Sequence, residues 1–128
     1  MTPRSAIARI KGLTVRIHII PVSGVTVLRC DGRLVLGPAA TRFRIAAERA
    51  LAECKVVALD LAGVWQMDAH GIGVLAQLYA SSRATGRALL LAGVNNRVQR
   101  LLHLTRLDTV MPTVTTVLDA DGESRVVA

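Results

Sequence analysis

The sequence predicts an α/β domain built around a mixed sheet. Two short runs, residues 56–61 and 88–92, are almost entirely apolar, which is typical of parallel strands covered on both faces. The stretch between them, from about residue 71 to residue 85, has the length and spacing of a helix and is followed by Gly86, the residue type favoured just beyond helix ends. Two strands bridged by a helix form a right-handed βαβ unit with a parallel pair of strands.

The N-terminal part of the chain adds an antiparallel hairpin. Residues 1–12 show little periodicity and are expected to be a loosely ordered leader. Apolar and polar side chains alternate over residues 13–20, which predicts a strand with one wet face. Residues 21–24 predict a turn, and the β-branched side chains of residues 25–30 predict a second strand. Because the turn is so short, we expect the two strands to pair with each other.

Further helices and one more strand complete the expected domain. A long amphipathic helix is predicted over residues 39–54, ahead of the first buried strand. Asn95 can cap a short helix, which is followed by a short edge strand at residues 110–114 and a last helical turn near residues 117–120. The expected architecture is a single domain over residues 13–120, with a four- to five-stranded mixed sheet flanked by about four helices, and a tail at residues 121–128.

The composition limits the classes of function. The chain has 128 residues, of which 52% are hydrophobic, so it can bury a core as a single domain. Its formal charge is +7, but the basic residues are scattered and their densest groups are not runs of five or more. One Phe, one Tyr and one Trp argue against a stacking platform for single-stranded nucleic acid. We expect a solvated basic surface rather than a nucleic-acid site; an acidic protein partner would use the same surface equally well.

The cysteines and the N-terminus indicate the cellular compartment. Cys30 and Cys54 are too few for a disulfide framework and form no CxxC or Cys/His cluster, so buried free thiols and no metal site are expected. The N-terminus lacks a continuous apolar segment, and no apolar run approaches the roughly 18 residues that a membrane span needs. A cytoplasmic location without a membrane span is the resulting expectation.

The sequence contains no recognisable catalytic motif. Its three histidines, His18, His70 and His103, lie far apart in the chain, and there is no GxSxG or HExxH pattern. Asp68 and His70 could form an acid–base pair, but residues two apart at a turn need not face one another. We therefore expect no catalytic residue, no cofactor and no enzymatic activity.

Asp68, Ala69, His70 and Gly71 stand where the first buried strand leads into the helix. Open α/β sheets bind their ligands at such turns. Gly71 and Gly73 stand at the start of the helix, where the free N–H groups of the first turn suit an anion. The third glycine of a dinucleotide fingerprint is, however, replaced by Ala76. Anion or nucleotide binding at this helix end is thus a weakly supported possibility. Asp68 can cap the helix, contact a partner, or do both.

The central stretch resembles the STAS domains, the family named for sulfate transporters and anti-sigma factor antagonists. The resemblance lies in the strand VVALDLAGV, the turn MDAHGIGVL, the return ATGRALLLAGV, the trailing NNRVQRLLHLTRLDTVM and the upstream VTVLRCDGRLV, and it extends over about residues 13–120. It implies a small sheet flanked by helices, in agreement with the expected architecture.

The resemblance also implies a site. In antagonist members of the family, the residue after the signature aspartate is usually a serine or threonine that a partner kinase phosphorylates to break the complex. The matching aspartate is Asp68 and the acceptor position is Ala69, which has no hydroxyl, while Gly71 and Gly73 fit the pattern. A partner-binding site at Asp68, Ala69, His70 and Gly71, without phosphorylation at residue 69, is what the resemblance implies.

Two functions are compatible with this resemblance. The first is a non-enzymatic interaction module for transcription regulation and signalling, similar to an anti-sigma factor antagonist, with an anti-sigma factor or kinase as its protein partner. The alternative is a STAS-like structural subunit of a lipid-transport ABC complex that docks on an ATPase subunit. A site without a phosphoacceptor is compatible with either function.

Overall fold

The computed structural model describes residues 4–10, 13–22, 24–118 and 124–127. Its strands form a seven-stranded sheet in the order β1-β2-β3-β4-β5-β6-β7. The elements are β1 (Arg4–Ile10), β2 (Leu13–Val22), β3 (Val25–Leu34), α1 (Pro38–Glu53), β4 (Val56–Met67), α2 (Ala69–Ala84), β5 (Ala88–Ala92), α3 (Asn96–Leu104), the 3-10 turn η1 (Leu107–Thr109), β6 (Thr113–Leu118) and β7 (Ser124–Val127).

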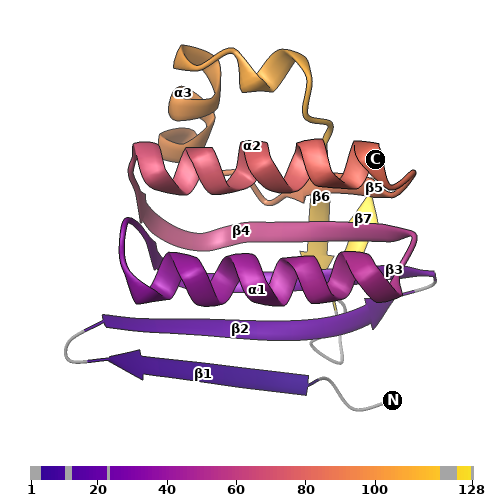
Figure 1. Cartoon of the computed structure of the whole chain (residues 1–128), viewed down its shortest axis with the longest axis horizontal. Helices are drawn as coiled ribbons and strands as arrows, with labels where there is room; N and C mark the ends of the chain where they lie inside the picture. The colour runs from indigo at the N-terminus through magenta and orange to yellow at the C-terminus, as the bar shows by residue number, and fades with distance from the viewer. Residues whose placement is uncertain (1–3, 11–12, 23, 119–123, 128) are drawn as a thin grey trace.

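The sheet is mixed, as predicted. Strands β2 and β3 form the expected antiparallel hairpin, and β3, β4, β5 and β6 run parallel to one another. Helices α1 and α2 lie side by side across one face of the sheet (Figure 1). The βαβ unit of β4, α2 and β5 and the α/β fold are therefore confirmed.

Two apolar clusters lie on the two faces of the sheet, because successive strand residues point to opposite sides. The larger cluster packs β3, β4 and β5 against the helices and includes Phe43, Leu59, Leu75 and Leu91, all at most 1% exposed. The smaller one contains Ile20, Val27 and Ala58. The sheet turns over at its last two strands: β6 pairs with β5 only at residues 113 and 114, and β7, which pairs with the rest of β6, lies against β2 and β3 behind them (Figure 1).

The structure departs from the prediction toward the C-terminus. The described residues contain three α-helices rather than about four. The helical turn expected near residues 117–120 is wrong at residues 117 and 118, which belong to β6; residues 119 and 120 lie outside the described part. The run TVTTV is rich in β-branched side chains, which favour a strand. Strand β6 also begins three residues later than the expected edge strand.

Strands also occur within the two terminal segments. Strand β1 lies within residues 1–12 and pairs antiparallel with β2. Strand β7 lies within residues 121–128 and pairs antiparallel with β6. In the described part of the chain, we find no helix with both the length and the apolarity needed to cross a membrane.

Candidate functional site

The candidate site lies where β3 and β4 extend beyond β5. The pairing of β4 with β3 continues to Met67 and Leu34, whereas its pairing with β5 stops at Asp60. Beyond Asp60, β4 has no β5 residue paired with it, and α3 contacts β4 instead. Asn95 joins the two elements: its Nδ2 donates to the carbonyl oxygen of Val64 (2.7 Å), and its Oδ1 accepts from the N–H of Val98 (3.0 Å). The predicted cap of α3 is confirmed.

Asp68 connects the start of α2 to the loop after β3. Its Oδ1 accepts from the N–H of Gly71 (2.9 Å) and caps the helix, while its Oδ2 accepts from the N–H of Leu36 (2.9 Å). Desolvation alone would raise the pKa of this carboxyl. The N–H donors of Leu36 and Gly71 and the nearby His70 outweigh it, so the pKa of Asp68 is lowered from its usual value. The carboxylate is ionised and already engaged at neutral pH.

Ala69 and His70 are the first two residues of α2. Both residues are exposed and follow the cap directly. Ala69 presents a methyl group at a position where a serine would present a hydroxyl. The structure thus leaves these two side chains accessible to a partner, while Asp68 holds the backbone beneath them in place.

Gly71 has a structural role that its position in the sequence did not reveal. It is buried, and an added Cβ would collide with the carbonyl oxygen of Leu34 and approach Cγ of Met67 to 2.8 Å. At Gly73, by contrast, an added Cβ would meet nothing within 4 Å. The Gly71 N–H is already bonded to Asp68. Gly71 therefore lets α2 pack closely on the end of β3.

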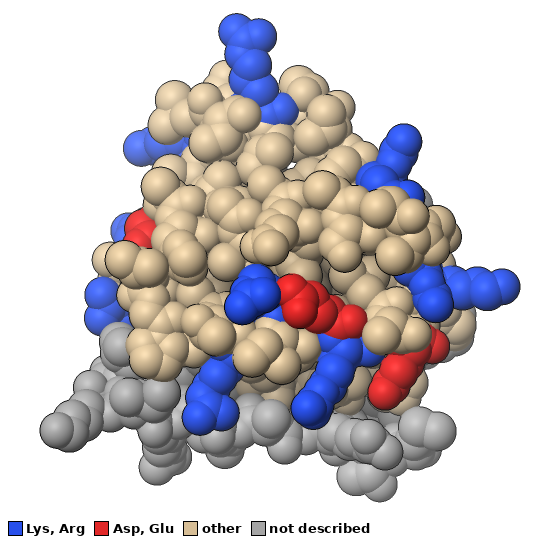
Figure 2. Space-filling view, in the orientation of Figure 1, with Lys and Arg blue, Asp and Glu red and all other residues tan. Residues whose placement is uncertain are grey.

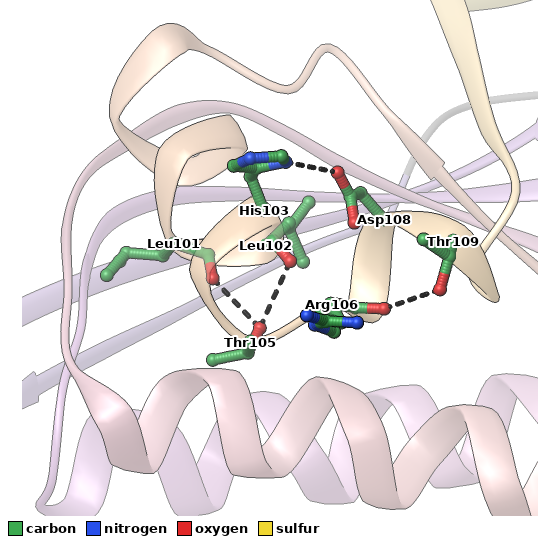
Figure 3. Close-up of polar contacts among 7 residues, drawn as sticks. All are labelled: Leu101, Leu102, His103, Thr105, Arg106, Asp108 and Thr109. Carbon is green, nitrogen blue, oxygen red and sulfur yellow. Dashed lines mark hydrogen bonds and ion pairs between the residues drawn. The ribbon is translucent and has the colours of Figure 1, made fainter.

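The three histidines lie in different places. His18 approaches Asp31 on the β2–β3 hairpin (3.8 Å), and His70 lies at the start of α2. His103 Nδ1 is 3.0 Å from Oδ2 of Asp108, so that this pair links the end of α3 to η1 (Figure 3). Within the described ranges, no group of three or more His, Cys, Asp or Glu side chains could hold a metal ion.

The two cysteines lie in different surroundings. Cys30 is fully buried, and desolvation, together with the neighbouring Asp31, raises its pKa to about 12, so its thiol stays protonated. Cys54 is half-buried, with its Sγ 3.0 Å from Oγ1 of Thr26. Both thiols are free, as predicted, although only Cys30 is fully buried.

The sequence interpretation missed a set of residues beside the turn. Trp65 on β4 and Leu36 in the loop after β3 are 58% and 71% exposed. The Arg33 guanidinium lies 5.6 Å from the centre of the Trp65 ring, and Arg97 on α3 donates to the Trp65 carbonyl oxygen (3.0 Å). The only indication of these residues in the sequence was that the single Trp of the chain ends the mostly apolar stretch of residues 56–65.

Among the described residues, the charged side chains on the helical face form no single basic stripe. Figure 2 shows lysine and arginine side chains distributed over this face, with aspartate and glutamate among them. On α1, for example, Arg44 pairs with Glu48 (3.1 Å). The basic residues, which are scattered along the sequence, are thus also scattered in space on this side of the molecule.

Comparison with known proteins places these features in a family. The family model of the STAS domain matches residues 16–120. A candidate anti-sigma factor antagonist from Thermotoga maritima has a similar structure, with a TM-score of 0.69 and 24% identity over 78% of this chain and 86% of the other.

Two further structures are similar. An anti-sigma factor antagonist from Mycobacterium paratuberculosis gives a TM-score of 0.64 at 18% identity over 88% of this chain and 85% of the other. A sulfate transporter family protein from Wolinella succinogenes gives 0.58 at 23% identity over 72% and 74%. At these identities, the likeness concerns the fold.

Proposed function

The chain belongs to the STAS domain family, and on this basis we propose that it is a non-enzymatic interaction module that acts like an anti-sigma factor antagonist. It binds a protein partner, an anti-sigma factor or kinase, through the first turn of α2. Asp68, Ala69, His70 and Gly71 form the docking turn, in which Ala69 and His70 contact the partner and Asp68 and Gly71 hold the backbone. The module works in the cytoplasm, in transcription regulation, and is not switched by phosphorylation at residue 69.

One observation carries this proposal: an exposed Ala69 directly follows Asp68, which caps α2 and accepts a second hydrogen bond from the N–H of Leu36. A phosphate at this position would place about two negative charges at the start of α2, against the docked partner. Alanine cannot accept a phosphate. The domain therefore stays in the form that resembles the unphosphorylated, binding-competent antagonist.

Restoring the hydroxyl tests the missing switch. The wild-type protein and Ala69→Ser are incubated with ATP and each anti-sigma kinase from the source genome. We expect one kinase to bind both proteins and to phosphorylate only Ala69→Ser, to one phosphate per chain at residue 69. Stoichiometric phosphate on the wild-type docking turn would contradict the proposal, as would an Ala69→Ser protein that every kinase leaves unmodified.

A charge at the same position tests the docking turn. Ala69→Glu should weaken partner binding strongly because it mimics the phosphate, whereas Ala80→Glu, on an exposed position far along α2, should not. Affinity is measured by calorimetry with the partner found above. Equal affinities of the two variants would show that the interface lies outside the docking turn. Co-purification of an ABC ATPase subunit without any kinase would favour the structural role in a transport complex instead.

A further inference from the structure

Trp65 is an unusual feature of the surface beside the docking turn. It is the sole tryptophan of the chain, lies three residues before Asp68, and is 58% exposed. Leu36, whose N–H binds the Asp68 carboxylate, is 71% exposed. Exposed tryptophan side chains are rare on free surfaces and frequent at the centres of protein interfaces, where they contribute much of the binding energy. Two exposed apolar side chains thus stand on the two segments that meet at Asp68, the end of β4 and the loop after β3.

Two arginines flank Trp65, and the groups they bind are neutral. Arg33 lies over the indole ring at 5.6 Å, and its Nε donates to the side-chain oxygen of Gln66 (2.8 Å). Arg97 donates to the Trp65 carbonyl oxygen (3.0 Å). Neither guanidinium forms an ion pair with a carboxylate of the described residues. Both positive charges are therefore left uncompensated by carboxylates of the described residues.

The carboxylates of β3, β4 and the docking turn have other neighbours. Asp60 forms an ion pair with Arg29 (3.2 Å), Asp68 accepts from two backbone N–H groups, and Asp31 lies 3.8 Å from Nε2 of His18. None of these three carboxylates forms an ion pair with Arg33 or Arg97. An incoming carboxylate would thus meet two cations whose hydrogen bonds within the described residues are with neutral groups, next to a large apolar ring.

From this arrangement we propose that the docking surface extends from α2 to Arg33, Leu36, Trp65 and Arg97, and that its occupant is an acidic protein segment carrying an apolar side chain. The apolar side chain covers Trp65 and Leu36, and the carboxylates pair with Arg33 and Arg97. Complementary charge of this kind directs both the encounter and the orientation of partners. The inference rests on the proposed interaction function and specifies the chemistry of the partner.

Trp65 itself provides the measurement, because no other residue contributes tryptophan fluorescence. The protein is titrated with a synthetic peptide of alternating glutamate and leucine, with the same peptide carrying lysine for every glutamate, and with phosphatidylglycerol vesicles. We expect a saturable blue shift with the glutamate peptide alone, weakened by salt. Arg33→Gln together with Arg97→Gln should weaken binding by about tenfold, and Arg44→Gln on α1 should leave it unchanged.

Calorimetry with Trp65→Ala completes the test, with an expected loss of affinity of at least about tenfold. Because the side chain is exposed, this variant should fold. A shift with the lysine peptide or only with vesicles, no shift at all, or full affinity after the double arginine substitution would each overturn the inference. The kinase assay with Ala69→Ser is independent of these readouts. If it succeeds while the glutamate peptide fails, only the acidic partner is refuted.

Discussion

The N–H of Leu36 donates to Oδ2 of Asp68 across 2.9 Å, so the residue that caps α2 also holds the loop after β3. The two contacts of this carboxylate join elements that are more than thirty residues apart in the chain. The candidate docking turn is therefore positioned by an interaction between its own cap and the neighbouring loop, and the strength of that interaction can be measured.

Asp68→Ala should lower the free energy of unfolding by about 1–2 kcal/mol, because it removes the cap of α2 and the acceptor for Leu36. Asp68→Asn keeps a side-chain oxygen for one donor and should lose less. Urea unfolding at neutral pH measures both variants. Equal stability of Asp68→Ala and the wild type would show that water replaces both contacts.

The lowered pKa of Asp68 predicts a dependence of stability on pH. In the unfolded chain this carboxyl titrates near pH 4. Since its folded pKa lies below that value, its contribution is complete above about pH 4 and is lost as the pH falls through the folded pKa. The stability difference between the wild type and Asp68→Asn should therefore shrink on acidification. A difference that stays constant down to about pH 2 would contradict the assignment.

Gly71→Ala should destabilise the protein by about 1–3 kcal/mol, because its Cβ would collide with the Leu34 carbonyl oxygen and Met67. Gly73→Ala is the matched control in the same helix. Its Cβ meets nothing, so alanine should raise stability by up to about 1 kcal/mol through its better helix propensity. Thermal unfolding of the two variants should give shifts of opposite sign. Shifts of the same sign would refute the packing role of Gly71.

Local signals made part of this structure predictable. Asp68 and Asn95 could be assigned as caps because a cap binds N–H groups only a few residues away. Gly86, with a φ of 69°, follows the C-terminal cap of α2 for an equally local reason. The burial of Gly71 depends on a carbonyl group from β3, which no local pattern contains. The exposure of Trp65 depends on how far β4 extends beyond β5.

The half-buried Arg29 and the buried Asp60 should be strongly coupled. Asp60 is 2% exposed, and its Oδ2 lies 3.2 Å from Nε of Arg29. Arg29→Met should cost roughly 3–5 kcal/mol because it leaves a buried carboxylate without its cation. Adding Asp60→Asn to that variant should cost less than Asp60→Asn does in the wild type. A double-mutant cycle by urea unfolding measures the coupling, and simple additivity of the two substitutions would argue against it.

Arg106 has a left-handed backbone conformation, which predicts the effect of a substitution by glycine. It has a φ of 61°, a left-handed conformation that costs about 1 kcal/mol or more for residues with a Cβ. Its carbonyl oxygen accepts from Thr109 Oγ1 (2.7 Å), and its N–H donates to the His103 carbonyl oxygen (3.1 Å) (Figure 3). Its side chain is exposed. Arg106→Gly should therefore stabilise the protein by about 0.5–1 kcal/mol. Arg100→Gly, at an exposed position inside α3, should destabilise it by about 1 kcal/mol. If thermal unfolding shows both variants to be destabilised, the Arg106 side chain contributes more than its backbone conformation costs.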